Sequence, residues 1–194
     1  MQHGLDLRWF DLKKTLQNAD KKELINIIQN LYRLSEENRW CLLAGSMEPE
    51  AEPGVLEAYR EIIKNEFFPE KGHGTLRYSV AEKEIDSYSK ASGDFEGKLE
   101  LMLFYVENGV DFTNEYGDID EKFYNKIVDM LEKFCNLLKT PEGKPLYPRF
   151  KKRLFEIRKK SEGIGWGFED DVELLVTDIE DFFDNPARSL HSHV

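Results

Sequence analysis

Apolar residues recur three and four positions apart in one segment after another, and this spacing limits what the chain can fold into. Between residues 20 and 42, for example, they occupy Leu24, Ile27, Ile28 and Leu31. Such spacing places them on one face of an α-helix, whereas a half-buried strand requires alternation at every second position. Because that alternation is nearly absent, the sequence predicts an all-α fold.

Helix start signals recur along the chain. Asp20, Ser79 and Asp118 each stand three residues before a glutamate. This is the spacing of a capping box, in which the first side chain and the glutamate satisfy each other's backbone amides. Residues 48–54 and 140–148 are rich in proline and glycine, as is typical of surface loops. These signals divide the chain into about seven helices.

The predicted helices suit a single domain spanning residues 1–194. Its ordered core would cover residues 10–183, and residues 184–194 would form a frayed tail, because they lack an apolar period. Two architectures fit helices joined by short loops: an irregular bundle and stacked antiparallel helix pairs. The sequence leaves both open.

The segment from Leu99 to Tyr116 is predicted to be a central helix with two different halves. It opens with six consecutive apolar residues, Leu101 to Val106. It then turns acidic, with Glu107, Asp111 and Glu115 at i, i+4 and i+8. On a continuous helix these carboxylates would share one face. They could form a solvated face, contact a basic partner or hold a divalent cation.

A helix break at Asn108-Gly109 would disrupt that spacing. Nearby oxygen ligands, at Asn114 and Asp118, extend the candidate cation site. The other acid pairs at helix starts, Asp118 with Glu121 and Asp170 with Glu173, are better explained as helix caps.

Charge is strongly segregated late in the chain. Residues 144–160 contain eight basic residues and one acid, and residues 161–187 contain nine acids and no base. The basic segment could contact nucleic acid through residues 149–160. Alternatively, the two segments form an antiparallel helix pair with complementary flanks. The formal net charge of −11 and the turn between the segments favour the pair.

That turn, from Ser161 to Asp170, contains three glycines around Trp166. It follows a helix rather than a strand and lacks the lysine of a phosphate-binding loop. We therefore expect Gly163, Gly165 and Gly167 to bend the backbone tightly. Trp166 would then plug the core or line a cleft, and Ile164 would fold back against the preceding helix.

Catalytic motifs are not apparent. There is no His-Glu-x-x-His, no Gly-x-Ser-x-Gly and no Cys/His pair with nucleophile spacing. Cys41 and Cys135 both have apolar neighbours and are expected to be buried thiols in a reducing cytosol. The first ten residues do not resemble a signal peptide, and the longest apolar run is six residues. A cytoplasmic protein is expected.

Three blocks of sequence resemble a small prokaryotic family catalogued only as a domain of unknown function. They are FYVENGVDFTNEYGDIDEKFYN (104–125), SEGIGWGFEDDVELL (161–175) and KKELINIIQNLYRLSEEN (21–38). The resemblance covers most of residues 10–183 and implies a helical cytosolic protein. It supplies no activity and no catalytic residues.

The function predicted from these features is a non-enzymatic protein-interaction or regulatory module. Its contact groove would lie between the acidic end of the central helix and the Trp166 turn, and it is lined by Glu107, Asp111, Asn114, Glu115 and Trp166. The partner would be an unidentified protein; nucleic acid is disfavoured and no membrane contact is expected. The chain would be a monomer or a homodimer.

Two alternatives come from other functional classes. A metal-dependent hydrolase would bind Mg²⁺ or Mn²⁺ through Glu107, Asp111 and Glu115. A nucleic-acid-binding protein would use the basic helix at 149–160. No other cofactor is expected.

Overall fold

The computed structural model describes residues 3–46, 53–69 and 78–184. This part of the chain contains nine α-helices, one 3-10 helix and no strand, which confirms the all-α prediction and is close to the predicted seven helices. The helices are α1 (His3–Asn18), α2 (Lys21–Leu34), α3 (Glu36–Ser46), α4 (Pro53–Phe67), α5 (Tyr78–Ser92), α6 (Phe95–Tyr116), α7 (Glu121–Leu138), α8 (Tyr147–Lys160) and α9 (Phe168–Asp184), with the 3-10 helix η1 (Lys144–Leu146) before α8.

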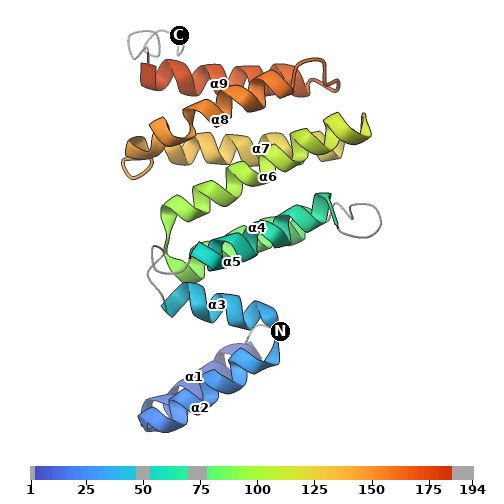
Figure 1. Ribbon diagram of the computed structural model, residues 1–194. Coiled ribbons are helices and arrows are strands. Elements are labelled where there is room, and N and C mark those ends of the chain that lie inside the picture. The colour runs from blue at the N-terminus through green and yellow to red at the C-terminus, as the bar shows by residue number, and fades with distance from the viewer. Residues whose placement is uncertain (1–2, 47–52, 70–77, 185–194) are drawn as a thin grey trace.

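Consecutive helices form pairs that stack along one axis (Figure 1). The pairs α4/α5, α6/α7 and α8/α9 pack within themselves and against their neighbours, through contacts of α6 with α4, α5 and α8 and of α7 with α9. Of the two architectures left open by the sequence, the described helices therefore adopt stacked pairs. We call α4 to α9 the body.

Helix α6 lies at the centre of the body. Thirteen of its residues are buried, including Leu99, Leu103 and Val106. They join a core to which every helix from α4 to α9 contributes. The predicted buried half of the central segment is confirmed.

The sequence left open whether the helix continues through Asn108-Gly109, and the structure shows that α6 runs unbroken to Tyr116. Gly109 instead permits close packing of α7. A Cβ atom at Gly109 would lie 2.4 Å from Cδ1 and 2.8 Å from Cγ1 of Ile127. The side chain of Asn108 bonds within the same helix, because its amide donates to the Phe104 carbonyl one turn earlier at 2.7 Å.

The helix caps confirm one prediction and correct two. Asp20 and Glu23 form the expected capping box, with both bonds at 2.8 Å. The box predicted at Asp118 is wrong: α7 is capped by Asp120, which accepts from the Phe123 amide at 2.8 Å. The box predicted at Ser79 is also wrong, because α5 already begins at Tyr78.

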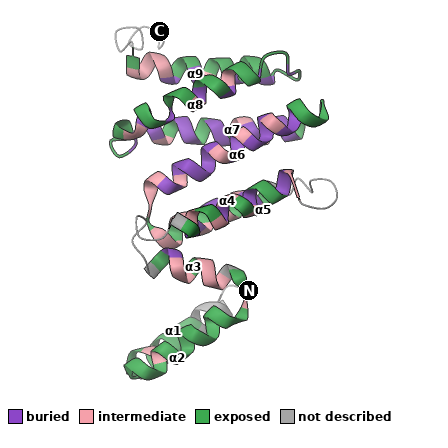
Figure 2. Ribbon diagram, viewed as in Figure 1, coloured by how far each residue is buried: buried purple, intermediate pink, exposed green. Residues whose placement is uncertain are grey.

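Helices α1 and α2 extend away from the body and are joined to it through α3 (Figure 1). We call them the N-terminal arm. Its described side chains are exposed or half-buried and none is fully buried (Figure 2). The stretch between residues 20 and 42 is not one helix, because the chain is divided at Ser35, where the amide of Asn38 donates to the Ser35 hydroxyl.

Both cysteines are free, but only Cys135 is buried as predicted; Cys41 is exposed on α3. Burial raises the pKa of the Cys135 thiol to about 12. Within the described ranges, no helix is long and apolar enough to cross a membrane. Most of the predicted loop at 48–54 and the predicted tail beyond residue 184 lie outside the described residues.

Candidate functional site

The acidic face of α6 lies against the basic helix α8. Glu107 receives two hydrogen bonds from the Arg153 guanidinium, from Nε at 2.7 Å and from Nη2 at 2.8 Å. Asp111 pairs with Lys160 at 2.7 Å. Two of the three acids in the predicted ladder therefore hold α8 in place rather than facing a partner.

Arg153 connects Glu107 to a second carboxylate that sequence reasoning missed. Its Nη1 donates to both oxygens of Glu100 at 2.7 Å, and Glu100 is only 6% exposed. Arg60 of α4 donates to the same carboxylate at 2.7 Å. We call Arg60, Glu100, Glu107 and Arg153 the charge bridge, since it links α4, α6 and α8.

Charge neutralisation explains how the charge bridge tolerates burial. Burial opposes the positive charge of Arg153, but hydrogen bonds and charge from Glu107 and Glu100 outweigh it, so the pKa of Arg153 is raised. The sequence did carry a signal for this arrangement. Glu100 precedes Glu107 by seven residues, which is two helical turns and therefore the same face. Glu100 was not recognised as part of this face because it directly precedes the apolar run from Leu101 to Val106.

A groove of about 410 Å³ lies between α4, α6 and α8, lined by Arg153, Glu107 and Asp111 among others. It lacks Asn114, Glu115 and Trp166 from the predicted groove. The five candidate residues therefore separate into two places. Glu107 and Asp111 line this groove, and the other three lie toward the end of α6.

The basic helix has acidic partners within the fold. Of its seven basic residues, five pair with acids: Arg149 with Glu96, Lys151 with Asp184, Arg153 with Glu100 and Glu107, Arg158 with Glu173 and Glu180, and Lys160 with Asp111. The predicted pairing of α8 with the acidic helix α9 is confirmed. The other contacts, to α6, were not anticipated from the sequence.

The three candidate metal ligands do not converge. Glu107 and Asp111 are paired with basic side chains, and Glu115 is exposed. Across the described residues, no group of three or more His, Cys, Asp or Glu side chains is placed to hold a metal ion. The arrangement that a carboxylate metal centre requires is therefore not formed by these residues.

The Trp166 turn lies beside the end of α6. Trp166 Nε1 donates to Asp118 Oδ2 at 2.9 Å, and the Asn114 side chain donates to the Lys160 carbonyl at 3.0 Å. Asp118 is in turn held by the Tyr124 hydroxyl at 2.6 Å. The structure thus brings together two sequence blocks nearly fifty residues apart.

Of the two positions expected for Trp166, in the core or lining a cleft, the first is wrong, because the residue is 58% exposed. Its backbone φ is +59°, the only positive value at a non-glycine residue in the described part of the chain. Gly167, which follows Trp166 directly, and Gly163, three residues before it, also have positive φ angles. As predicted, Ile164 folds inward and is buried. The glycines therefore turn the backbone so that the tryptophan faces outward.

A second exposed aromatic residue ends α6. Tyr116 is 53% exposed and packs against Phe112 and Phe68, with ring centroids 4.7 and 6.2 Å apart. Exposed acids lie here at the end of α6, in the connection to the start of α7, in the turn before α9 and in the first turn of α9: Glu115, Asp118, Asp120, Glu121, Glu162, Glu169, Asp170 and Asp171. We call these acids with Tyr116 and Trp166 the Trp166 surface.

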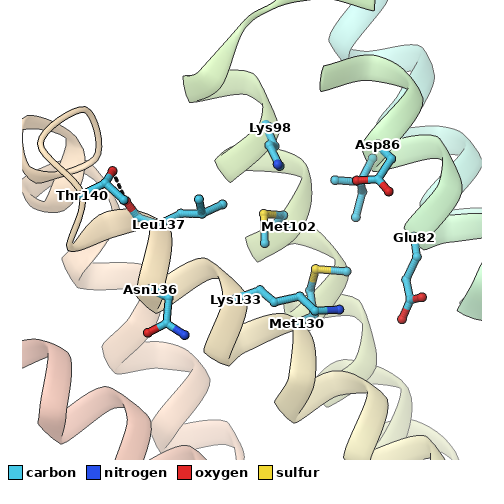
Figure 3. A pocket seen from close by; sticks show the side chains of 10 residues that line it. Glu82, Asp86, Lys98, Met102, Met130, Lys133, Asn136, Leu137 and Thr140 are labelled. Carbon is cyan, nitrogen blue, oxygen red and sulfur yellow. Dashed lines mark hydrogen bonds between the residues drawn. The ribbon is translucent and has the colours of Figure 1, made fainter. Parts of the chain in front are cut away.

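A separate pocket of about 550 Å³ lies between α5, α6 and α7. Glu82 and Asp86 come from α5, Lys98 from α6 and Lys133 from α7, with methionines between them (Figure 3). Lys126 pairs with Glu82 at 3.3 Å. Sequence reasoning missed this pocket because three helices build it and no local motif marks it.

Comparison with known sequences identifies the family. Residues 7–180 match the family described as Family of unknown function (DUF6155). The chain belongs to DUF6155. The match spans most of the arm and nearly all of the body, and it confirms the resemblance to an uncharacterised family. No curated protein and no solved structure gives a significant match.

DUF6155 membership adds no catalytic residue, because the family's function is unknown. What can be said of function therefore depends on the geometry of this chain. The charge bridge serves packing, whereas the Trp166 surface presents exposed groups held in fixed positions.

Proposed function

We propose that this chain is a non-enzymatic protein-interaction module that binds a basic partner through the Trp166 surface. The supporting observation is that Trp166 is both exposed and fixed. A non-glycine residue at positive φ costs on the order of 1 kcal/mol or more. The hydrogen bond to Asp118 keeps the indole in place despite that cost.

An exposed, fixed tryptophan suits protein recognition. Tryptophan and tyrosine are enriched among the residues that contribute most to binding free energy, and they lose little entropy on binding. Trp166 and Tyr116 are each more than half exposed and would supply the apolar contact.

The charge of the surface indicates the kind of partner. The eight acids of the Trp166 surface come from residues 115–121 and 162–171, which contain no basic residue. Opposite charges on a partner would speed association and favour the correct orientation. We therefore infer a lysine- or arginine-rich protein surface as the partner.

We also infer that the module works in the cytoplasm. Both cysteines are free thiols, and free thiols persist in reducing compartments.

Affinity capture from native lysate tests the proposal, with the full chain as bait and captured proteins quantified by mass spectrometry. Trp166→Ala should reduce recovery of specific partners at least about tenfold, the loss expected for a central binding residue. Leu174→Ala is the matched control, because Leu174 is 69% exposed on α9 and lies outside the Trp166 surface. It should leave recovery unchanged.

A second variant tests the charge of the surface. Asp170→Asn with Asp171→Asn should weaken the same interactions, and more so at low salt than at high salt. Unchanged recovery with both the tryptophan and the charge variants would contradict the proposal. Circular dichroism of each variant would verify that the fold is retained.

A further inference from the structure

The N-terminal arm carries most of the exposed apolar surface in the described part of the molecule. Nine of the thirteen large hydrophobic residues that are exposed there lie between Trp9 and Leu34. Their exposed fractions range from 40% at Ile27 to 73% at Leu34. Helix α2 has no buried residue at all, although its sequence is strongly amphipathic.

Four of these side chains share one face of α2. Ile27, Ile28, Leu31 and Leu34 follow the three-and-four spacing that places them along one stripe. The polar residues Lys22, Gln29 and Arg33 occupy the other side. We call the stripe the apolar face of the arm. A face of this kind normally packs against another helix, because an isolated helix of this length is marginal in water.

We propose that the apolar face of the arm binds the same face of a second copy of this chain, forming a two-fold symmetric four-helix bundle. Two helical hairpins that pack face to face form such a bundle, and a two-fold axis requires only that the face be self-complementary. The arm extends away from the body, so a second arm can approach it without obstruction (Figure 1).

The two helices of the arm together expose apolar area on the scale of a dimer interface. Three of the nine exposed residues are aromatic, at 41–67% exposed, and an aromatic side chain can bury roughly 150–250 Å². With the six partly exposed leucines and isoleucines, the arm offers on the order of several hundred Å² per copy. A standard interface buries about 800 Å² per partner, whereas the largest apolar patch of a typical monomer covers about 300–600 Å².

The distribution of charge also favours a second copy. Residues 3–34 contain six basic and four acidic residues, a net charge of +2, so the rest of the chain carries −13. Contact between two bodies is therefore repulsive, and the arms are where two copies can meet. Four lysines, at positions 13, 14, 21 and 22, flank the turn between α1 and α2, at the end of the arm far from the body. In an antiparallel arrangement this turn approaches the acidic body of the partner.

Sedimentation velocity of the full chain over a range of concentrations tests the proposal. The natural sequence should form a dimer. Ile28→Glu places a charge in the apolar face and should yield a monomer, with dimer affinity reduced at least tenfold. Gln29→Glu adds the same charge on the polar side of the same helix and should remain a dimer.

A variant without an added charge tests whether loss of the dimer comes from the interface and not from misfolding. Ile28→Ala with Leu31→Ala introduces no charge and should still weaken the dimer at least tenfold. Both residues are more than 40% exposed, so the circular dichroism of the body should not change. A monomer at every concentration would overturn the proposal. If that monomer sedimented with anionic lipid vesicles, the apolar face would bind a membrane surface and not a second copy, and the proposal would still be overturned. Equal dimerisation of Ile28→Glu and Gln29→Glu would also overturn it.

Discussion

Helices α2 and α7 both have an apolar face, but this face is buried in α7 and exposed in α2. Both are strongly amphipathic and both begin at an aspartate cap. Helix α7 buries eight residues against α6 and α9, whereas α2 buries none. The comparison teaches that amphipathic spacing defines which face of a helix is apolar but not what covers that face.

The same contrast separates the arm from the body. The body buries its apolar surface within the chain and joins its layers through the charge bridge. The arm has apolar side chains of the same kind, but those from Trp9 to Leu34 that remain exposed are 40–73% exposed among the described residues. Stability should therefore depend on the body, and association should depend on the arm.

The largest effect is expected from a substitution in the body core. Phe134 is fully buried and packs edge-to-face against Phe150 at 5.3 Å. Phe134→Ala should reduce the free energy of unfolding by about 3–5 kcal/mol. Leu34→Ala in the arm, where the side chain is 73% exposed, should change it by less than about 0.5 kcal/mol. Urea unfolding measured at low protein concentration would verify the difference, and equal losses would contradict it.

An intermediate effect is expected at the charge bridge. Arg153→Ala leaves Glu107 without its partner and Glu100 with Arg60 alone, so the free energy of unfolding should fall by about 2–3 kcal/mol, less than for a fully buried pair. The neighbouring Lys152→Ala should have almost no effect, because Lys152 is exposed. Chemical denaturation of the two variants side by side would show whether the bridge joins the layers. A loss of similar size in both would refute that role.

The smallest effect is expected at the cap of α2. Asp20→Ala removes the carboxylate that accepts from the Glu23 amide, while the backbone amide of residue 20 can still donate to Glu23, and it should destabilise α2 by about 1 kcal/mol. Because α2 contributes no buried residue, the unfolding midpoint of the body should stay unchanged while the dimer weakens. Thermal unfolding of the body combined with sedimentation would separate these outcomes. A lowered body midpoint would show that the arm and the body unfold together.

The sequence predicted the fold where local patterns determine it. Periodicity indicated the helices, and Asp20 with Glu23 marked a true cap because both partners lie within one turn. The sequence prediction was wrong where contacts between residues far apart in the chain determine the local structure. From the local sequence alone, Gly109 suggests the end of a helix. In the structure it is a glycine because Ile127 of α7 occupies the space that a side chain would need. Asp118 reads as a cap, but Trp166 and Tyr124 use its two oxygens.

The candidate site was predictable in part for the same reason. Glu107 and Asp111 were recognised as one helical face, but their partners on α8 lie more than forty residues away in sequence. Trp166 was singled out by its glycines. Whether it faced the core or solvent depended on its positive φ, which no local pattern reveals.

Hydrogen exchange of the full chain at increasing protein concentration tests the division between arm and body most directly. Amides of α6 and α7 should be strongly protected at every concentration, because their core is internal to the chain. Amides of α2 should exchange rapidly in dilute solution and gain protection as the concentration rises. Protection of α2 that equals that of α7 in dilute solution, or that never changes with concentration, would contradict the account.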